Sequence, residues 1–169
     1  MTTGNMKLRE MLLLALIAAM MVATQVAMSY LPNVHLVAVF VILAVLLFGW
    51  KALISVYIFV ALEALIYGFS TWVINYLYIW AILALIALAF RKNRLPLFWA
   101  AVSGAFGLCF GALCAIPYWF MGGWAMAVSY WIAGIPYDLI HCVSNALLAY
   151  LLLMPLYRLC GKLLKNNRQ

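Results

Sequence analysis

Acidic side chains are nearly absent from this sequence, in which Asp and Glu together number 3 of 169 residues against 10 Lys and Arg. Charged residues of both signs make up only 8% of the chain, which is too few to give a soluble domain its polar surface. This scarcity of charge excludes a soluble protein. It also leaves no stretch of the chain from which a separate soluble domain could be built.

Several motifs of catalysis and metal binding are missing as well. The sequence contains no GxxxxGK[ST] motif, so it cannot supply an ATPase, and neither HExxH nor GxSxG is present. We therefore expect no enzyme and no bound cofactor or metal. The cysteines show no CxxC and no metal-ligand spacing, so we expect them to be reduced and structural. These four residues are Cys109, Cys114, Cys142 and Cys160.

What the sequence has in abundance is apolar length. Hydrophobic residues make up 71% of the chain and the mean hydropathy is +1.17. A helix needs about 20 apolar residues to cross the membrane core, so the sequence predicts an all-α integral membrane protein, residues 1–169, that folds as a single bundle of six transmembrane helices. The first apolar run is too long for the core of a signal peptide. Turn-forming residues divide the chain into predicted spans 11–30, 34–49, 52–68, 72–90, 97–117 and 128–158.

Basic residues predict how the bundle is oriented. They occur before the first span, between the second and third, between the fourth and fifth, and after the sixth, whereas the three alternate loops contain none. The positive-inside rule then places both termini in the cytoplasm. The net charge of +7 is explained by this topology and by attraction to anionic membrane lipid, and needs no nucleic acid. The basic positions are Lys7, Arg9, Lys51, Arg91, Lys92, Arg94, Arg158, Lys162, Lys165 and Arg168.

Five polar side chains interrupt the apolar spans at positions predicted to lie in their outer halves. Asp138, His141 and Asn145 follow one another at three and four residues, so they share one face of a helix. Glu63 and Asn75 lie at similar depth on two other helices. Ionisable groups inside a membrane are costly and commonly functional, which favours one shared pocket. The alternative is structural: Asp138 pairs with His141, and Asn145 hydrogen-bonds a neighbouring helix.

Aromatic residues are concentrated in the same region. They serve either as a belt that anchors the helices at the membrane interface or, with Gly122 and Gly123 as hinges, as a lid over an outward-facing cavity. Aromatic faces beside a few polar groups suit a planar heterocycle, and the absence of Lys and Arg disfavours an anionic one. The aromatic residues of this region are Tyr67, Trp72, Tyr76, Tyr78, Trp80, Tyr118, Trp119, Trp124, Trp131 and Tyr137.

Small residues recur every four positions in two of the predicted helices. In the first helix the row is Ala15, Ala19 and Ala23, extended by Ala27. In the fifth the row is Ser103, Gly107, Gly111 and Ala115. Such rows let another helix approach closely, either inside the same chain or in a partner protein.

Together these residues resemble the substrate-binding S components of energy-coupling factor (ECF) vitamin transporters. The resemblance covers the whole chain, and its most specific part is the opening segment "KLREMLLLALIAAMMVATQV". It implies that Ala15, Ala19 and Ala23 dock on an ECF transmembrane coupling protein, which is driven by two cytoplasmic ATPases in the cell membrane of a prokaryote. It also implies a substrate site at the extracellular side, which here matches Asn75, Trp119, Trp124, Asp138, His141 and Asn145.

The expected function is capture of a small neutral or weakly cationic heterocyclic vitamin or precursor, followed by delivery through reorientation in the bilayer. The full set of candidate substrate-binding residues adds Glu63, Tyr67 and Trp72 to the six positions above. The family's nickel and cobalt members depend on a histidine near the initiator, which "MTTGNMK" does not contain. The alternative function is a stand-alone proton-coupled carrier, with Glu63, Asp138 and His141 as the proton relay.

Overall fold

The computed structural model describes residues 8–166, and all regular secondary structure in that range is helical. This confirms the predicted all-α class. The predicted basic positions Lys7 and Arg168 lie outside the described residues. The elements in chain order are α1 (Leu8–Ala27), α2 (Val37–Phe48), η1 (Gly49–Lys51), α3 (Ala52–Tyr67), α4 (Thr71–Ala89), α5 (Pro96–Cys114), α6 (Ile116–Leu148), η2 (Ala149–Leu153) and α7 (Met154–Asn166).

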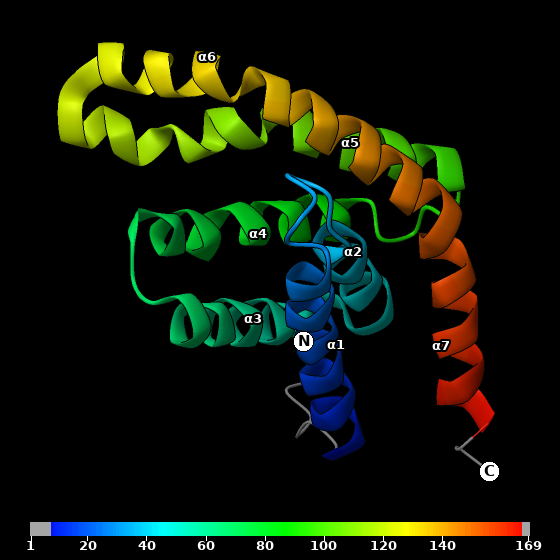
Figure 1. Ribbon diagram of the computed structural model, residues 1–169. Helices are drawn as coiled ribbons and strands as arrows, with labels where there is room; N and C mark the ends of the chain where they lie inside the picture. The colour runs from blue at the N-terminus through cyan, green and yellow to red at the C-terminus, as the bar shows by residue number, and fades with distance from the viewer. Residues whose placement is uncertain (1–7, 167–169) are drawn as a thin grey trace.

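Two helical hairpins and a central helix make up most of the molecule. α3 and α4 form one hairpin and α5 and α6 form the other, which extends past the first on the left of Figure 1. α2 contacts α1, α3, α4, η2 and α7. Ten of its twelve residues are buried, as expected for a helix that is apolar on every side. α2 is therefore the core around which the other helices pack.

The solvent-accessible surface around the outside of the helix bundle is apolar. Leu65 is 78% exposed, Leu97 73% and Val143 68%, and they belong to three different helices. Apolar exposure on this scale suits lipid and not water. Five helical segments within residues 8–166 are long and apolar enough to cross a membrane. The chain is therefore a multi-pass membrane protein.

The predicted count of six spans depends on α2. Residues 37–67 form a single helical stretch, broken at Gly49, whose φ of 63° turns the chain between α2 and α3. α2 has only 12 residues, and at 1.5 Å per residue it extends about 18 Å, whereas the membrane core is about 30 Å thick. α2 is thus too short to span alone. The six-span count and the cytoplasmic termini stay predictions.

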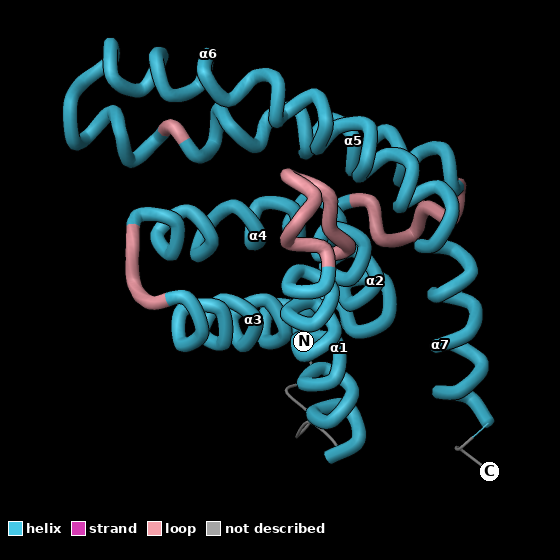
Figure 2. The backbone as a smooth tube through the Cα atoms, in the orientation of Figure 1, coloured by secondary structure: helices cyan, strands magenta, loops and turns pink. Residues whose placement is uncertain are grey.

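The predicted loop at residues 118–127 is wrong in its extent. The helix resumes at Ile116, directly after α5, and is interrupted only at Gly122 and Gly123, where Gly123 has a φ of 76°. The chain reverses direction at these glycines, which lie inside α6 (Figure 1). A separate, short non-helical piece lies between the end of α5 and the beginning of α6 (Figure 2). Pro117 stands in the first turn of this helix, where proline is tolerated.

The predicted last helix, 128–158, is helical throughout but changes direction near its end. A five-residue π-helix, η2, follows α6, and α7 then runs in a different direction (Figure 1). Pro155 is the second residue of α7 and has no N–H to donate to the preceding turn. Proline and π-turns are the usual causes of such kinks.

Basic side chains gather at one end of the bundle. Arg9 Nη2 donates to the Leu163 carbonyl at 2.9 Å, and Lys51 Nζ lies 2.6 Å from Glu10 Oε2. The Arg94 guanidinium lies 4.7 Å from the centre of the Tyr157 ring. These contacts join α1, η1, the 90–95 connection and α7. The beginning of α1 and the end of α7 therefore lie on the same side of the protein.

Candidate functional site

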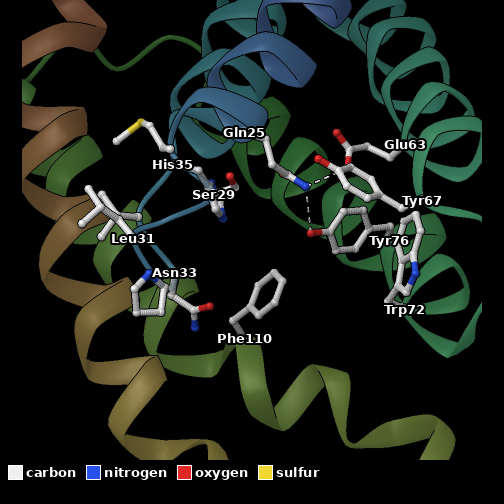
Figure 3. Close-up of a pocket in the computed structure, with 13 residues that line it drawn as sticks. Gln25, Ser29, Leu31, Asn33, His35, Glu63, Tyr67, Trp72, Tyr76 and Phe110 are labelled. Atoms are coloured by element: carbon white, nitrogen blue, oxygen red, sulfur yellow. Dashed lines mark hydrogen bonds between the residues drawn. The ribbon is translucent and has the colours of Figure 1, made fainter.

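A cavity of about 430 Å³ lies beneath the segment that connects α1 to α2. Its walls come from that segment, from the end of α1, and from α3, α4 and α5 (Figure 3). The cavity is at the end of α3 and the beginning of α4, away from the basic side chains described above. Its lining residues are Gln25, Met28, Ser29, Leu31, Pro32, Asn33, Val34, His35, Glu63, Tyr67, Trp72, Tyr76 and Phe110.

The polar wall of this cavity is built from Gln25 and Glu63. Gln25 Nε2 donates to Glu63 Oε2 at 2.9 Å and lies 3.5 Å from the Tyr76 hydroxyl. Glu63 is only 1% exposed. Its second oxygen, Oε1, and the amide oxygen of Gln25 are both buried and have no hydrogen-bond partner within residues 8–166. Buried polar atoms normally have partners, so these two oxygens have room in the cavity for a partner such as an ordered water or a ligand.

Aromatic rings line the cavity beside this polar pair. Trp72 packs edge-on against Tyr76 with ring centres 5.2 Å apart, and Tyr76 stacks on Phe59 at 5.9 Å. Tyr67 and Phe110 complete the apolar surface around the open space in Figure 3. Such rings present flat faces against which a planar molecule can pack.

His35 closes the cavity from the connecting segment. Its ring centre lies 4.9 Å from that of His141 and 5.7 Å from that of Trp80. Burial lowers the pKa of His35 to about 4, so its imidazole is neutral at pH 7. Its Nδ1 atom is buried and without a partner in the described part of the chain.

A second cavity, of about 330 Å³, lies on the other side of Asn33 and Phe110, which line both spaces. Asn33 has a φ of 56°. Its Nδ2 donates to the Tyr137 carbonyl at 3.1 Å, and Ser144 Oγ donates to the Asn33 carbonyl at 3.0 Å. These bonds tether the connecting segment to α6 and hold Asn33 as a partition between the two cavities.

Asp138, His141 and Asn145 share the buried face of α6, as their spacing predicts. Asp138 lines the second cavity, and its Oδ1 accepts the Gly111 backbone N–H at 2.9 Å. His141 and Asn145 are fully buried and line neither cavity. Their side-chain nitrogen and oxygen atoms have no partners among residues 8–166, so Asp138 and His141 do not form the alternative hydrogen-bonded pair there.

The remaining sequence-predicted residues occupy other places. Asn75 Oδ1 lies 3.0 Å from the Tyr78 hydroxyl, which is 2.6 Å from the Leu113 carbonyl, so Asn75 belongs to the contact of α4 with α5. Trp119 and Trp124 line a third, apolar cavity of about 220 Å³ near the α6 turn. Of the nine predicted substrate-binding residues, Glu63, Tyr67 and Trp72 meet in the first cavity.

Sequence reasoning missed Gln25, Asn33, His35 and Phe110. Gln25 is the one amide in the first apolar run, a signal of the same kind that identified Asn75 and Asn145. His35 and Asn33 lie in a turn-forming segment, "LPNVH", where polar residues are ordinary. Their part in the cavity depends on how that segment folds back over α3 and α4.

The two rows of small residues have opposite surroundings. Ala15, Ala19 and Ala23 are all exposed on α1. Gly107 and Gly111 are buried against α6, and a Cβ on Gly107 would lie 2.7 Å from the His141 carbonyl oxygen. The row on α5 therefore serves packing inside the chain, while the row on α1 is open.

Metal and disulfide chemistry find no support in the described residues. No group of three or more His, Cys, Asp or Glu in residues 8–166 could hold a metal ion. All four cysteines are free thiols: Cys114 is buried, Cys142 and Cys160 are half-buried, and Cys109 is exposed. Comparison with protein-family models, with curated proteins and with solved structures finds no match to this chain.

Proposed function

We propose that this chain is the substrate-binding subunit of an ECF-type importer in the cell membrane of a prokaryote. It captures a small heterocyclic vitamin or precursor from outside and delivers it by reorientation, which a partner ATPase module drives. The cavity beneath residues 28–35 carries the proposal. It combines a buried carboxylate with aromatic walls at the end of the bundle away from the basic side chains.

The distribution of charge supports an outward-facing site. Arg9, Lys51, Arg91 and Arg94 belong to the segments at one end of the protein, and the positive-inside rule assigns that end to the cytoplasm. The connecting segment over the cavity contains neither Lys nor Arg. A ligand would therefore enter from the extracellular side.

The size and chemistry of the cavity suit a small molecule. A volume of about 430 Å³ is within the range of ligand pockets. Glu63, Gln25 and His35 supply directional contacts, while Trp72 and Tyr76 offer flat apolar surface. With no Lys or Arg among its lining residues, the cavity favours a neutral or weakly cationic ligand over an anion.

The exposed alanine row on α1 supports docking to the ECF coupling protein. Ala15, Ala19 and Ala23 leave a smooth surface against which a partner helix can pack closely. Energy would come from the two cytoplasmic ATPases of the module. The chain itself would only bind substrate and change its orientation.

The test has two parts. In the first, thermal unfolding of the detergent-purified protein is followed with a panel of vitamins and their precursors. A ligand at a hundred times its Kd should stabilise the folded state by about 2.7 kcal/mol. In the second, the protein is reconstituted into vesicles with and without the coupling protein and ATPases.

Uptake that requires ATP and the partner subunits supports the proposal. Uptake driven by a proton gradient in vesicles that contain this chain alone would contradict it, and would favour the proton-coupled carrier. Failure of a folded protein to bind any member of the panel would also count against the proposal.

A further inference from the structure

The cavity beneath residues 28–35 contains two neighbouring hydrogen-bond acceptors whose orientation is fixed. Glu63 Oε2 receives the Gln25 N–H, which leaves Glu63 Oε1 free and turns the Gln25 amide oxygen away from the carboxylate. The opposite orientation of the Gln25 amide would set oxygen against oxygen. The hydrogen bond therefore assigns the amide, and with Glu63 ionised both free atoms are acceptors.

Both free acceptors are buried. Glu63 is 1% exposed, and neither Glu63 Oε1 nor Gln25 Oε1 has a partner within residues 8–166. No Lys or Arg lines the cavity to compensate the carboxylate. A buried acceptor without a donor is costly, and a buried carboxylate more so. A ligand that brings two donors to this point would remove both penalties.

We propose that the Gln25–Glu63 pair selects a planar heterocycle that carries an exocyclic amino group. One N–H of that group donates to Glu63 Oε1 and the other to Gln25 Oε1, while the ring packs among Trp72, Tyr76 and Phe110. This inference rests on the proposed function and narrows its substrate class. It also assigns the substrate to the Glu63 cavity and not to the cavity that Asp138 lines.

The aromatic walls explain why a conjugated amine fits better than an aliphatic one. The lone pair of an amino group on an aromatic ring is delocalised into the ring, so the group lies in the ring plane and acts as a donor. A flat ring then brings both N–H bonds to the polar wall while its faces contact Tyr76 and Trp72. An oxo group at the same position would set acceptor against acceptor.

Matched pairs of heterocycles test this selection directly. Thermal shift and equilibrium binding are measured on the detergent-purified full chain with adenine against hypoxanthine, cytosine against uracil, and guanine against xanthine. In each pair an amino group is replaced by an oxo group on the same ring. At least one amino member should bind, about tenfold or more tightly than its oxo partner, because the oxo member leaves both acceptors unpaired.

Glu63→Gln locates the effect. The glutamine side chain has the same shape, can still accept the Gln25 N–H through its amide oxygen, and places an NH₂ group where the free oxygen stood. The preference for the amino member should disappear in this variant. Glu10→Gln makes the same chemical change at the basic end of the bundle, beside Lys51, and should leave the preference unchanged.

Three results would overturn the inference: oxo members that bind as tightly as amino members, a preference that survives in Glu63→Gln, or no binding of any amino member. In the first two cases a ligand still binds, so the proposed function stands without this selectivity. In the third, the vitamin panel described above decides separately whether the proposed function falls. If Glu63→Gln does not fold, the preference measured on the unaltered protein still decides the matter.

Discussion

Two rows of small residues with the same spacing have opposite surroundings in this protein. On α5, Gly107 and Gly111 are buried against α6: the α6 backbone at His141 lies on Gly107, and the Asp138 carboxylate lies on Gly111. On α1, Ala15, Ala19 and Ala23 are exposed, and the residues of α1 that face the core are Leu14, Ala18 and Met21.

Spacing alone therefore does not say what covers a smooth helix face. The α5 row is covered by the next helix of the same chain, α6. The two helices therefore pack closely, and the Gly111 N–H reaches the Asp138 carboxylate. The α1 row, which has alanines where the α5 row has glycines, has no such cover within the described residues. Substitutions in the two rows should therefore affect different properties.

The largest loss of stability should come from Gly107→Ala. The added Cβ would lie 2.7 Å from the His141 carbonyl oxygen, and backbone on both helices would have to move apart. Overpacking of this kind costs about 3 kcal/mol. Chemical denaturation in detergent would measure it. Gly134→Ala is the matched control, because a Cβ there meets nothing within 4 Å and a helix gains from Ala in place of Gly.

Gly111→Ala should cost less, about 1 to 2 kcal/mol. Its Cβ would collide with the Asp138 carboxylate, which can rotate away at the expense of its hydrogen bond to Gly111 N–H. The cost should therefore shrink when Asp138 is already replaced by Ala. A double-mutant cycle that shows no coupling between the two positions would contradict the role given to this contact.

A smaller loss of stability should follow from lowering the pH, through His35 in the segment that connects α1 to α2. Because the folded-state pKa of His35 is lowered to about 4 from 6.5, the unfolded chain takes up a proton first as pH falls. The contribution of neutral His35 is fully present above about pH 6.5 and should be lost progressively between there and about pH 4. The fall in Tm over this range should be smaller in His35→Gln than in the unaltered protein.

The smallest change in stability should come from Ala19→Leu. The side chain would project from an exposed face, so the free energy of unfolding should change by no more than about 0.5 kcal/mol. Assembly with the coupling protein should nevertheless be lost, while ligand-induced stabilisation persists. Co-purification of the partner subunits with Ala19→Leu in normal yield would break the contrast between the two rows.

Most helix positions could be predicted from the sequence because apolar length and turn residues determine them. The predicted span 52–68 corresponds to Ala52–Tyr67, and 72–90 corresponds to Thr71–Ala89. The errors arise where tertiary contacts decide. A 12-residue α2 is stable because ten of its residues are buried by other helices, and hydropathy alone does not report that.

The candidate site was predictable only in part. The cost of burying Glu63 among apolar residues identified it, Tyr67 lies one helical turn further along α3, and Trp72 follows at the start of α4. Helical spacing correctly placed Asp138, His141 and Asn145 on one face, yet periodicity cannot say whether that face meets a cavity or another helix. Here α5 covers most of it, through a close approach of the two helices at Gly107 and Gly111.

Gln25 shows the complementary limit. One amide in a run of apolar residues carries no periodic signal, and its importance comes from Glu63, 38 positions away, to which it donates. Only the packing of α1 against α3 brings the two together.

Native mass spectrometry of the protein purified from its own cells most directly tests the central claim, that the Gln25–Glu63 cavity holds a small-molecule substrate. The account predicts one bound molecule on the unaltered protein, released on unfolding, and none on Glu63→Gln purified in parallel at equal yield. A molecule that remains bound to folded Glu63→Gln, or an unaltered protein that carries nothing and takes up nothing from a vitamin mixture, would contradict it.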